Sequence, residues 1–195
     1  RYLIQTLRVP ATRLVFFGYL GHMWELYAMW AWISSFLAVV YGTRSLAGGS
    51  LDLASLVNFL VFVAGAAGCV AAGFFAERYG RTLATSIAMV ISGGMGLFIG
   101  FLPIEWGLVI ALVALVWGAS VVADSAQFST ALTELSEDAY RGTALAFQTG
   151  LGFLLTIVSI WLVPVLGGSE GWGLALRYWP SAPYWEQRPC SGCVP

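Results

Sequence analysis

Long apolar runs and short polar segments alternate along this chain. Five apolar runs each reach about 20 residues, the length that a helix needs to cross a hydrocarbon core about 30 Å thick. None of them alternates polar and apolar positions as barrel strands do, so the pattern predicts helices. The predicted spans are residues 14–41, 54–76, 83–102, 106–128 and 143–166.

The polar links between the predicted spans are short. Residues 42–53 are rich in Gly and Ser, residues 103–105 form a tight turn that begins with Pro103, and residues 136–142 are acidic and end on Arg and Gly. Short links force neighbouring spans to run antiparallel. The sequence therefore predicts an all-α fold, a polytopic bundle of about five transmembrane helices.

The composition places this bundle in a membrane. Hydrophobic residues make up 59% of the chain and charged residues only 10%, whereas soluble domains carry about 25% charged residues. So few charges cannot surround a soluble core, and the mean hydropathy is +0.81. The expected partner of the surface is the lipid bilayer. A net charge of −1 gives no indication of nucleic-acid binding.

Arginine placement predicts the orientation. Cytoplasmic links carry an excess of basic residues, and only Arg44 lies on the opposite side before the final tail. We therefore expect a multi-pass protein of the cell membrane (plasma or inner), with the start of the chain on the cytoplasmic side. The arginines that fall on this side are Arg1, Arg8, Arg13, Arg78, Arg81 and Arg141.

Charged residues interrupt the apolar pattern between the second and third spans, in the segment GFFAERYGR (73–81). We expect Gly73 to let a neighbouring helix approach, and Gly80 to permit a tight reversal. Glu77 is expected to accept hydrogen bonds at a helix start and to pair with an arginine. Arg78 and Arg81 would stay on the cytoplasmic side. The alternative is an ordinary charged loop that only anchors the topology.

This segment resembles the loop motif of the major facilitator superfamily. That motif joins helices two and three of these transporters, and a related copy joins helices eight and nine. Glu77 stands where Asp is commoner, and Thr82 where a further basic residue is frequent. Residues 18–32 resemble helix seven of bacterial members, and residues 121–129 resemble helix ten. The resemblance therefore identifies the five spans with helices seven to eleven.

The resemblance covers residues 14–172 and implies a function. Superfamily members have two halves of six helices and bind substrate between them near the middle of the bilayer. Residues 1–172 would then be a partial carboxy-terminal half whose partner, the amino-terminal half of the same transporter, is missing from this chain. The implied function is secondary transport of a small-molecule substrate, with protons as a candidate coupling ion and no cofactor.

Residues 173–195 depart from that family pattern. The segment 177–195 holds four prolines and two arginines, where the family would continue into a twelfth apolar helix. Proline and arginine at this density exclude a span. We expect an atypical tail from a shifted or truncated reading frame, and a genuine short tail is the alternative. Cys190 and Cys193 have a redox or half-zinc spacing, for which accident is the simpler explanation.

His22 and Glu25 lie inside the first span. They are three residues apart and share a helix face, which Trp32 continues. A charge at the centre of a bilayer costs about 2.5 to 3.5 kcal/mol on insertion scales, and such residues usually mark ion or substrate paths. The pair is therefore a candidate for the transport path or for proton coupling. The alternative is a structural pair that holds helices together.

A second polar face follows in the fourth span. Ser120, Asp124 and Gln127 are four and then three residues apart, and Glu134 extends the face towards the cytoplasm. This face either lines a transport path or holds neighbouring helices together, and the sequence favours neither alternative. Gln148 adds a polar position to the fifth span. The candidate residues for a substrate path or proton coupling are His22, Glu25, Trp32, Asp124, Gln127 and Gln148.

Small residues recur at every fourth position in three of the spans. In lipid, such stripes allow helix backbones to approach closely. Since the chain has 23 glycines, chance is the alternative. The stripes are Gly65, Cys69 and Gly73; Ser92, Gly96 and Gly100; and Gly142, Ala146 and Gly150.

The sequence does not support metal binding, ATP-driven transport or nucleophilic catalysis. The chain has one His, which excludes a metal site with two of them, and no Lys, which argues against a phosphate-binding loop and ATP-driven transport. No nucleophile turn accompanies His22. We expect no enzyme, metal or cofactor. Two alternatives to a transporter remain: a non-transporting assembly or sensor subunit, and a membrane enzyme using His22 and Glu25.

Overall fold

A computed structural model describes residues 10–42 and 52–167, and its elements in these ranges are helices. Within these two ranges, five spans are long and apolar enough to cross a membrane, and α5 and α6 together form the fourth. The predicted all-α, polytopic fold is confirmed. The helices are α2 (Pro10–Tyr41), α3 (Leu53–Tyr79), α4 (Arg81–Ile99), α5 (Gly107–Ala123), α6 (Ser125–Leu135) and α7 (Arg141–Gly167).

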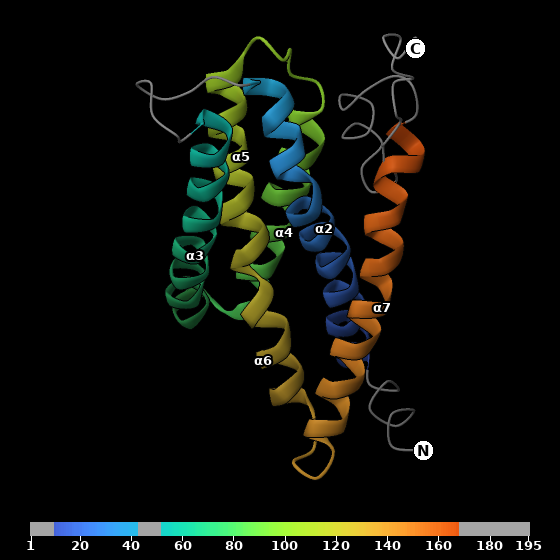
Figure 1. The fold of residues 1–195 in the computed structure, drawn as a ribbon. Coiled ribbons are helices and arrows are strands. Elements are labelled where there is room, and N and C mark those ends of the chain that lie inside the picture. The colour runs from blue at the N-terminus through green and yellow to red at the C-terminus, as the bar shows by residue number, and fades with distance from the viewer. Residues whose placement is uncertain (1–9, 43–51, 168–195) are drawn as a thin grey trace.

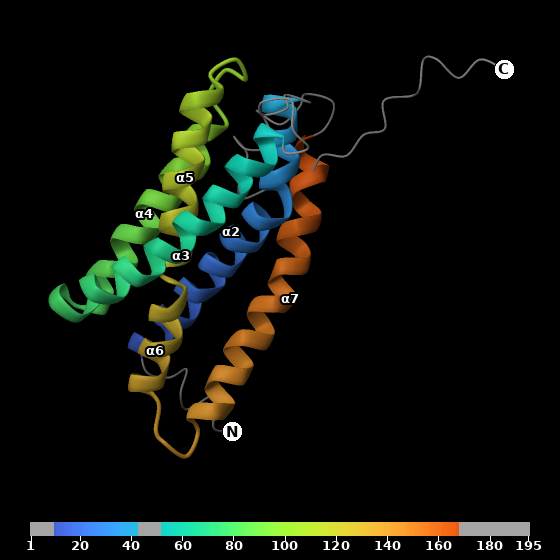
Figure 2. The same ribbon diagram turned by 60° about the vertical axis from the view of Figure 1, so that its left-hand side comes forward.

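The helices form an up-and-down bundle around α2 and α5 (Figure 1). The helices α2, α4 and α7 run in one direction, and α3 and α5–α6 run in the other. Figure 2 shows α3 and α4 on one side of the bundle and α7 on the opposite side, beside α2. The α5 helix packs against α2, α3 and α4, so its polar face lies inside the bundle rather than towards lipid.

The fourth span bends at Asp124. The sequence predicts one helix from 106 to 128 with a polar face, whereas the structure ends α5 at Ala123 and begins α6 at Ser125. The backbone amides of Gln127 and Phe128 donate to the carbonyl oxygen of Asp124, which starts the new helix. The span continues through α6 to Leu135, and Gln127 and Glu134 of α6 accept hydrogen bonds from Arg81 of α4. The third span is shorter than predicted and ends as a helix at Ile99.

The closest helix contact joins α3 and α5. A Cβ added at Gly68 would overlap the carbonyl oxygen of Ala119, and one at Gly118 would lie 2.7 Å from the carbonyl oxygen of Val61. A Cβ at Gly65 would be 3.2 Å from the carbonyl oxygen of Gly118. These glycines let the two backbones touch, which is how small residues stabilise helix pairs in lipid.

The predicted stripes of small residues are correct only in part. Gly65 and Gly96 lie at close helix contacts, as expected, and the helix that they meet is α5. A Cβ at Gly73, Gly142 or Gly150 would meet no atom within 4 Å, so these three do not mediate helix contacts in the described chain. The expectation that Gly73 lets a helix approach is therefore wrong. The close approach of a helix occurs instead at Gly68, one position before the predicted stripe residue Cys69.

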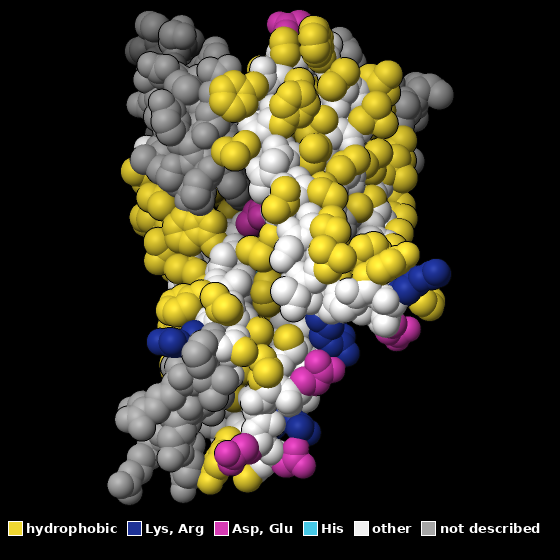
Figure 3. All heavy atoms as spheres, turned by 180° about the vertical axis from the view of Figure 1, so that it is seen from behind, with side chains coloured by type: hydrophobic (Ala, Val, Ile, Leu, Met, Phe, Trp, Pro, Cys, Tyr) yellow, Lys and Arg dark blue, Asp and Glu magenta, His cyan; other side chains and the backbone are white. Residues whose placement is uncertain are grey.

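The surface has an apolar belt with charges at one end. Figure 3 shows hydrophobic side chains over most of the height, with arginines and most acidic side chains gathered below them. Large apolar side chains such as Leu14, Val90, Leu108 and Trp161 are three-quarters exposed, as expected of a face that meets lipid. Length, composition and this surface indicate a membrane-embedded protein.

Candidate functional site

Glu25 lies at the centre of a polar cluster between α2, α4 and α5. Its Oε1 accepts a hydrogen bond from Nε1 of Trp117 at 2.8 Å, and its Oε2 accepts one from Oγ of Ser92 at 3.1 Å. The three side chains come from three different helices. Both oxygens of this carboxyl group therefore have donors inside an apolar bundle, where an unpaired one would be costly.

Small residues on α4 make this geometry possible. Ser92 is buried and short enough to bring its hydroxyl beside Glu25. One turn further along α4, a Cβ at Gly96 would lie 3.1 Å from the indole ring of Trp117. A larger residue there would displace the indole. The stripe of small residues on α4 thus fixes the position of the Trp117 N–H.

His22 and Asp124 form a second pair next to Glu25. Nδ1 of His22 lies 2.8 Å from Oδ1 of Asp124, and their side chains are 1% and 2% exposed. The contact has the distance of an ion pair but not the alignment of a hydrogen bond. The imidazole is flanked by the rings of Tyr19 and Phe128. Asp124 is the residue at which α5 and α6 separate, so this pair holds the bend against α2.

Arg81 joins the start of α4 to α6. Its guanidinium donates to both carboxylate oxygens of Glu134, with 2.9 Å from Nη2 to Oε1 and 3.1 Å from Nε to Oε2. Its Nη1 also donates to Oε1 of Gln127 at 3.0 Å. Two charge-assisted bonds to one carboxylate fix the orientation of both groups. The ion pair is partly exposed and lies at the charged end of the bundle.

In the segment 73–81, the ion pair forms with a different carboxylate from the predicted Glu77. Gly80 has φ of +93°, a conformation that favours glycine, and it confirms the predicted tight reversal between α3 and α4. Within residues 10–42 and 52–167, no side chain forms a capping hydrogen bond at the start of α4, so the expected capping by Glu77 is wrong. Arg81 pairs with Glu134 of α6. The exposed Arg78 stacks on the ring of Tyr79 at 5.6 Å.

Two predicted site residues lie outside this cluster. Nε1 of Trp32 donates to the carbonyl oxygen of Ile160 at 3.2 Å, which ties α2 to α7. Gln148 of α7 is fully buried. Among residues 10–42 and 52–167, neither of its amide atoms has a hydrogen-bond partner. The sequence grouped Trp32 with His22 and Glu25 by helical position, and it singled out Gln148 only as a polar position in the fifth span.

A cleft lies at the charged end of the bundle. It has a volume of about 580 Å³, and its walls come from α2, α4 and α6. Arg81, Gln127 and Glu134 line it, together with Gly18 and Phe128. The centroid of the Phe128 ring lies 5.8 Å from that of the His22 ring. Phe128 therefore separates the cleft from the His22–Asp124 pair.

This arrangement is suited to moving a proton. Glu25 has two hydrogen-bond donors, and the buried side chains of His22 and Asp124 form a close ion-pair contact with each other. In the described part of the chain, no three His, Cys, Asp or Glu side chains gather as metal ligands do. Cys190 and Cys193 and the tail 173–195 lie outside the described residues.

The sequence did not indicate two residues of the site. Trp117 stands in an apolar run and resembles any lipid-facing aromatic, because nothing in its neighbourhood shows where its N–H points. The sequence marks Ser92 only as one of the small residues that recur along the third span. Their role follows from the partner helix. Comparison of the chain with models of protein families and with curated proteins finds no match.

Proposed function

We propose that the chain is part of the carboxy-terminal half of a secondary transporter of the major facilitator type, which carries a small solute with proton coupling. The observation that supports this most is Glu25, an ionisable group with two buried donors inside an apolar membrane bundle. Such groups are expensive in a bilayer and usually mark ion or substrate paths. The loop motif at residues 73–81 supports the same assignment.

In this proposal the buried cluster around Glu25 and the Arg81–Glu134 ion pair have separate tasks. Glu25, with His22 and Asp124, takes up and releases the coupling proton. Arg81 and Glu134 act as a latch between α4 and α6, at the end where the cleft opens. Transporters of this type work by rocking of helix groups around a central site. The bend at Asp124 is a point at which α6 could move relative to α5.

A non-transporting assembly or sensor subunit is the second candidate. The observation in its favour is that the described partners of Glu25, His22 and Asp124 belong to the same bundle. Groups that only lock helices would show this pattern. A structural role predicts that their replacement lowers stability, whereas a role in coupling predicts loss of proton movement from a folded protein.

Transport is tested with the full product of the gene in liposomes that hold a pH-sensitive dye. Sugars, organic acids, amino acids and inorganic anions are added one at a time under an imposed proton gradient. We expect one chemical class to change the internal pH. A folded, inserted protein that responds to no class would contradict the proposal and support a non-transporting subunit.

The orientation gives a separate prediction. In our proposal the end that carries Arg13, Arg78, Arg81 and Arg141 faces the cytoplasm. In a background without native cysteines, a Cys placed at Glu105 should react with an impermeant thiol reagent added outside intact cells. A Cys placed at Tyr79 should react only after the cells are opened. Both positions are exposed in the structure, so the reverse pattern would overturn the orientation.

The latch also gives a prediction. Replacing Glu134 with Gln removes the bidentate partner of Arg81, and we expect slower transport with normal expression. Expression should persist because an exposed ion pair contributes only about 0 to 1 kcal/mol to stability. Glu137→Gln is the matched control, since Glu137 is exposed at the same end. Equal transport rates of the two variants would remove the latch from the mechanism.

A further inference from the structure

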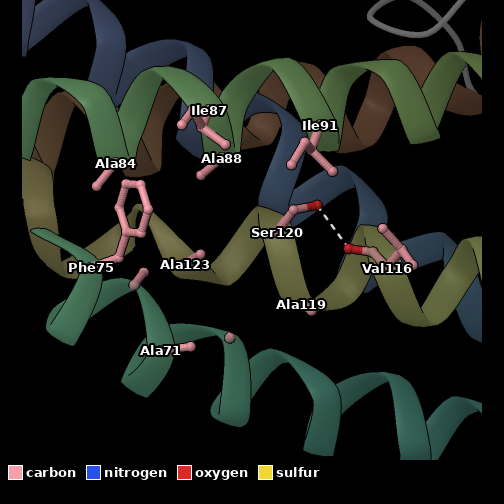
Figure 4. A pocket seen from close by; sticks show the side chains of 12 residues that line it. Ala71, Phe75, Ala84, Ile87, Ala88, Ile91, Val116, Ala119, Ser120 and Ala123 are labelled. Carbon is pink, nitrogen blue, oxygen red and sulfur yellow. Dashed lines mark hydrogen bonds between the residues drawn. The ribbon is translucent and has the colours of Figure 1, made fainter. Parts of the chain in front are cut away.

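An apolar groove lies on the outer face of the bundle between α3 and α4. Its volume is about 370 Å³, and α5 forms its floor. Figure 4 shows side chains of α4 and α3 on either side of α5, with the Phe75 ring near Ala84 at one end. Ile87, Ile91 and Val116 line the groove and are exposed, so it opens outward. This groove is distinct from the cleft that holds Arg81.

The shape of the groove suits a hydrocarbon chain. Small residues line it along its length, among them Gly68, Ala71, Ala88 and Ala119. Its wall on α4 runs from Ala84 to Ile91, about 10 Å at 1.5 Å per residue. At the end where Phe75 lies near Ala84, the two walls lead to Gly80, the single residue that joins α3 to α4. A helix with side chains is about 10 Å wide. An acyl chain has only the width of a single methylene group, so it is the better candidate for a groove between two neighbouring helices.

A positive charge lies near the Phe75–Ala84 end of the groove. Gly68, Ala71, Ala72 and Phe75 form the α3 wall, and their spacing of three and four residues continues to Arg78. Arg78 is exposed, and within residues 10–42 and 52–167 it forms no ion pair with a carboxylate. At 100° per residue, Glu77 falls on the opposite side of α3. Arg78 is thus the charge nearest the groove that remains available for a partner.

We propose that this groove binds one anionic phospholipid, with an acyl chain between α3 and α4 and the phosphate at Arg78. Apolar surface open to the bilayer is filled by hydrocarbon, and a basic residue at the membrane surface attracts anionic lipid. Arg81 does not compete for the phosphate, because Glu134 and Gln127 already occupy its guanidinium. The site is independent of any transported solute.

Two matched pairs of variants test the lipid site. Ala71→Phe fills the groove, while Ala66→Phe puts the same ring on the opposite side of α3. Both alanines are exposed, so neither variant should disturb folding. Arg78→Gln removes the charge at the groove, and Arg13→Gln removes an exposed arginine from the same end of the bundle.

The full chain is equilibrated with equal amounts of dioleoyl phosphatidylglycerol and dioleoyl phosphatidylcholine, and retained lipids are counted by native mass spectrometry. We expect one retained lipid, with phosphatidylglycerol favoured about fivefold, the effect of one arginine near an anionic surface. Ala71→Phe should lose the retained lipid, and Arg78→Gln should lose only the preference. The two controls should behave as the unaltered chain does.

Three results would overturn the proposal. One is equal lipid retention by Ala71→Phe and Ala66→Phe, which would show that the groove does not hold the lipid. Another is an equal loss of preference in Arg78→Gln and Arg13→Gln, which would show a general surface effect. The third is a loss of self-association in Ala71→Phe with lipid retention unchanged, which would identify a second copy of the chain as the occupant.

Discussion

Replacing Gly68 with alanine is expected to destabilise the bundle more than any other single-methyl change that the structure suggests. The added Cβ would overlap the carbonyl oxygen of Ala119, and the next nearest atoms are also backbone atoms of Ala119. Backbone cannot move aside as a flexible side chain can. Overpacking of this kind costs about 1 to 3 kcal/mol, occasionally more. The helices α3 and α5 would have to separate along their closest contact.

The same substitution at Gly73 is the matched control. Gly73 lies on the same helix, and a Cβ there would meet no atom within 4 Å. Alanine is favoured over glycine inside a helix by about 1 kcal/mol, so Gly73→Ala should be neutral or slightly stabilising. Thermal unfolding of the two variants in the same detergent measures the difference. Equal thermal unfolding midpoints of the two variants would show that the backbones of α3 and α5 are not in contact at Gly68.

Replacing Glu25 with Gln is expected to abolish proton-driven accumulation in the proposed transporter. The amide keeps the size of the carboxyl group, and its oxygen can accept the bond from Nε1 of Trp117. It cannot take up or release a proton in step with transport. Exchange of labelled substrate across the membrane should therefore continue, while concentration above equilibrium stops. Uptake with and without a proton gradient separates these two activities.

Ser92→Ala is the control for the loss of a hydrogen bond. It removes the donor to Oε2 of Glu25 but leaves the ionisable group in place. We expect it to lower stability, because a buried acceptor loses a partner, while accumulation persists. Normal accumulation by a well-expressed Glu25→Gln protein would remove Glu25 from coupling. Loss of expression in both variants would favour the role in locking helices.

The sequence alone determined the architecture of this protein. Apolar runs of the right length, separated by short polar links, leave transmembrane helices as the only way to satisfy the backbone in lipid. Local spacing also placed His22 beside Glu25 on one face, and Asp124 beside Gln127 on another. The reversal at Gly80 followed from its position between two spans. Each of these conclusions depends on lengths and spacings along the chain and not on contacts between helices.

Only the tertiary structure decided the partners. That Glu25 meets Trp117, that His22 meets Asp124 and that Arg81 binds Glu134 depends on how far each helix rotates and slides against its neighbour. Sequence spacing within one helix does not contain that information. The same reason explains the error at Gly73 and the omission of Gly68, since every fourth residue of a glycine-rich helix looks alike until a second helix selects the face it touches.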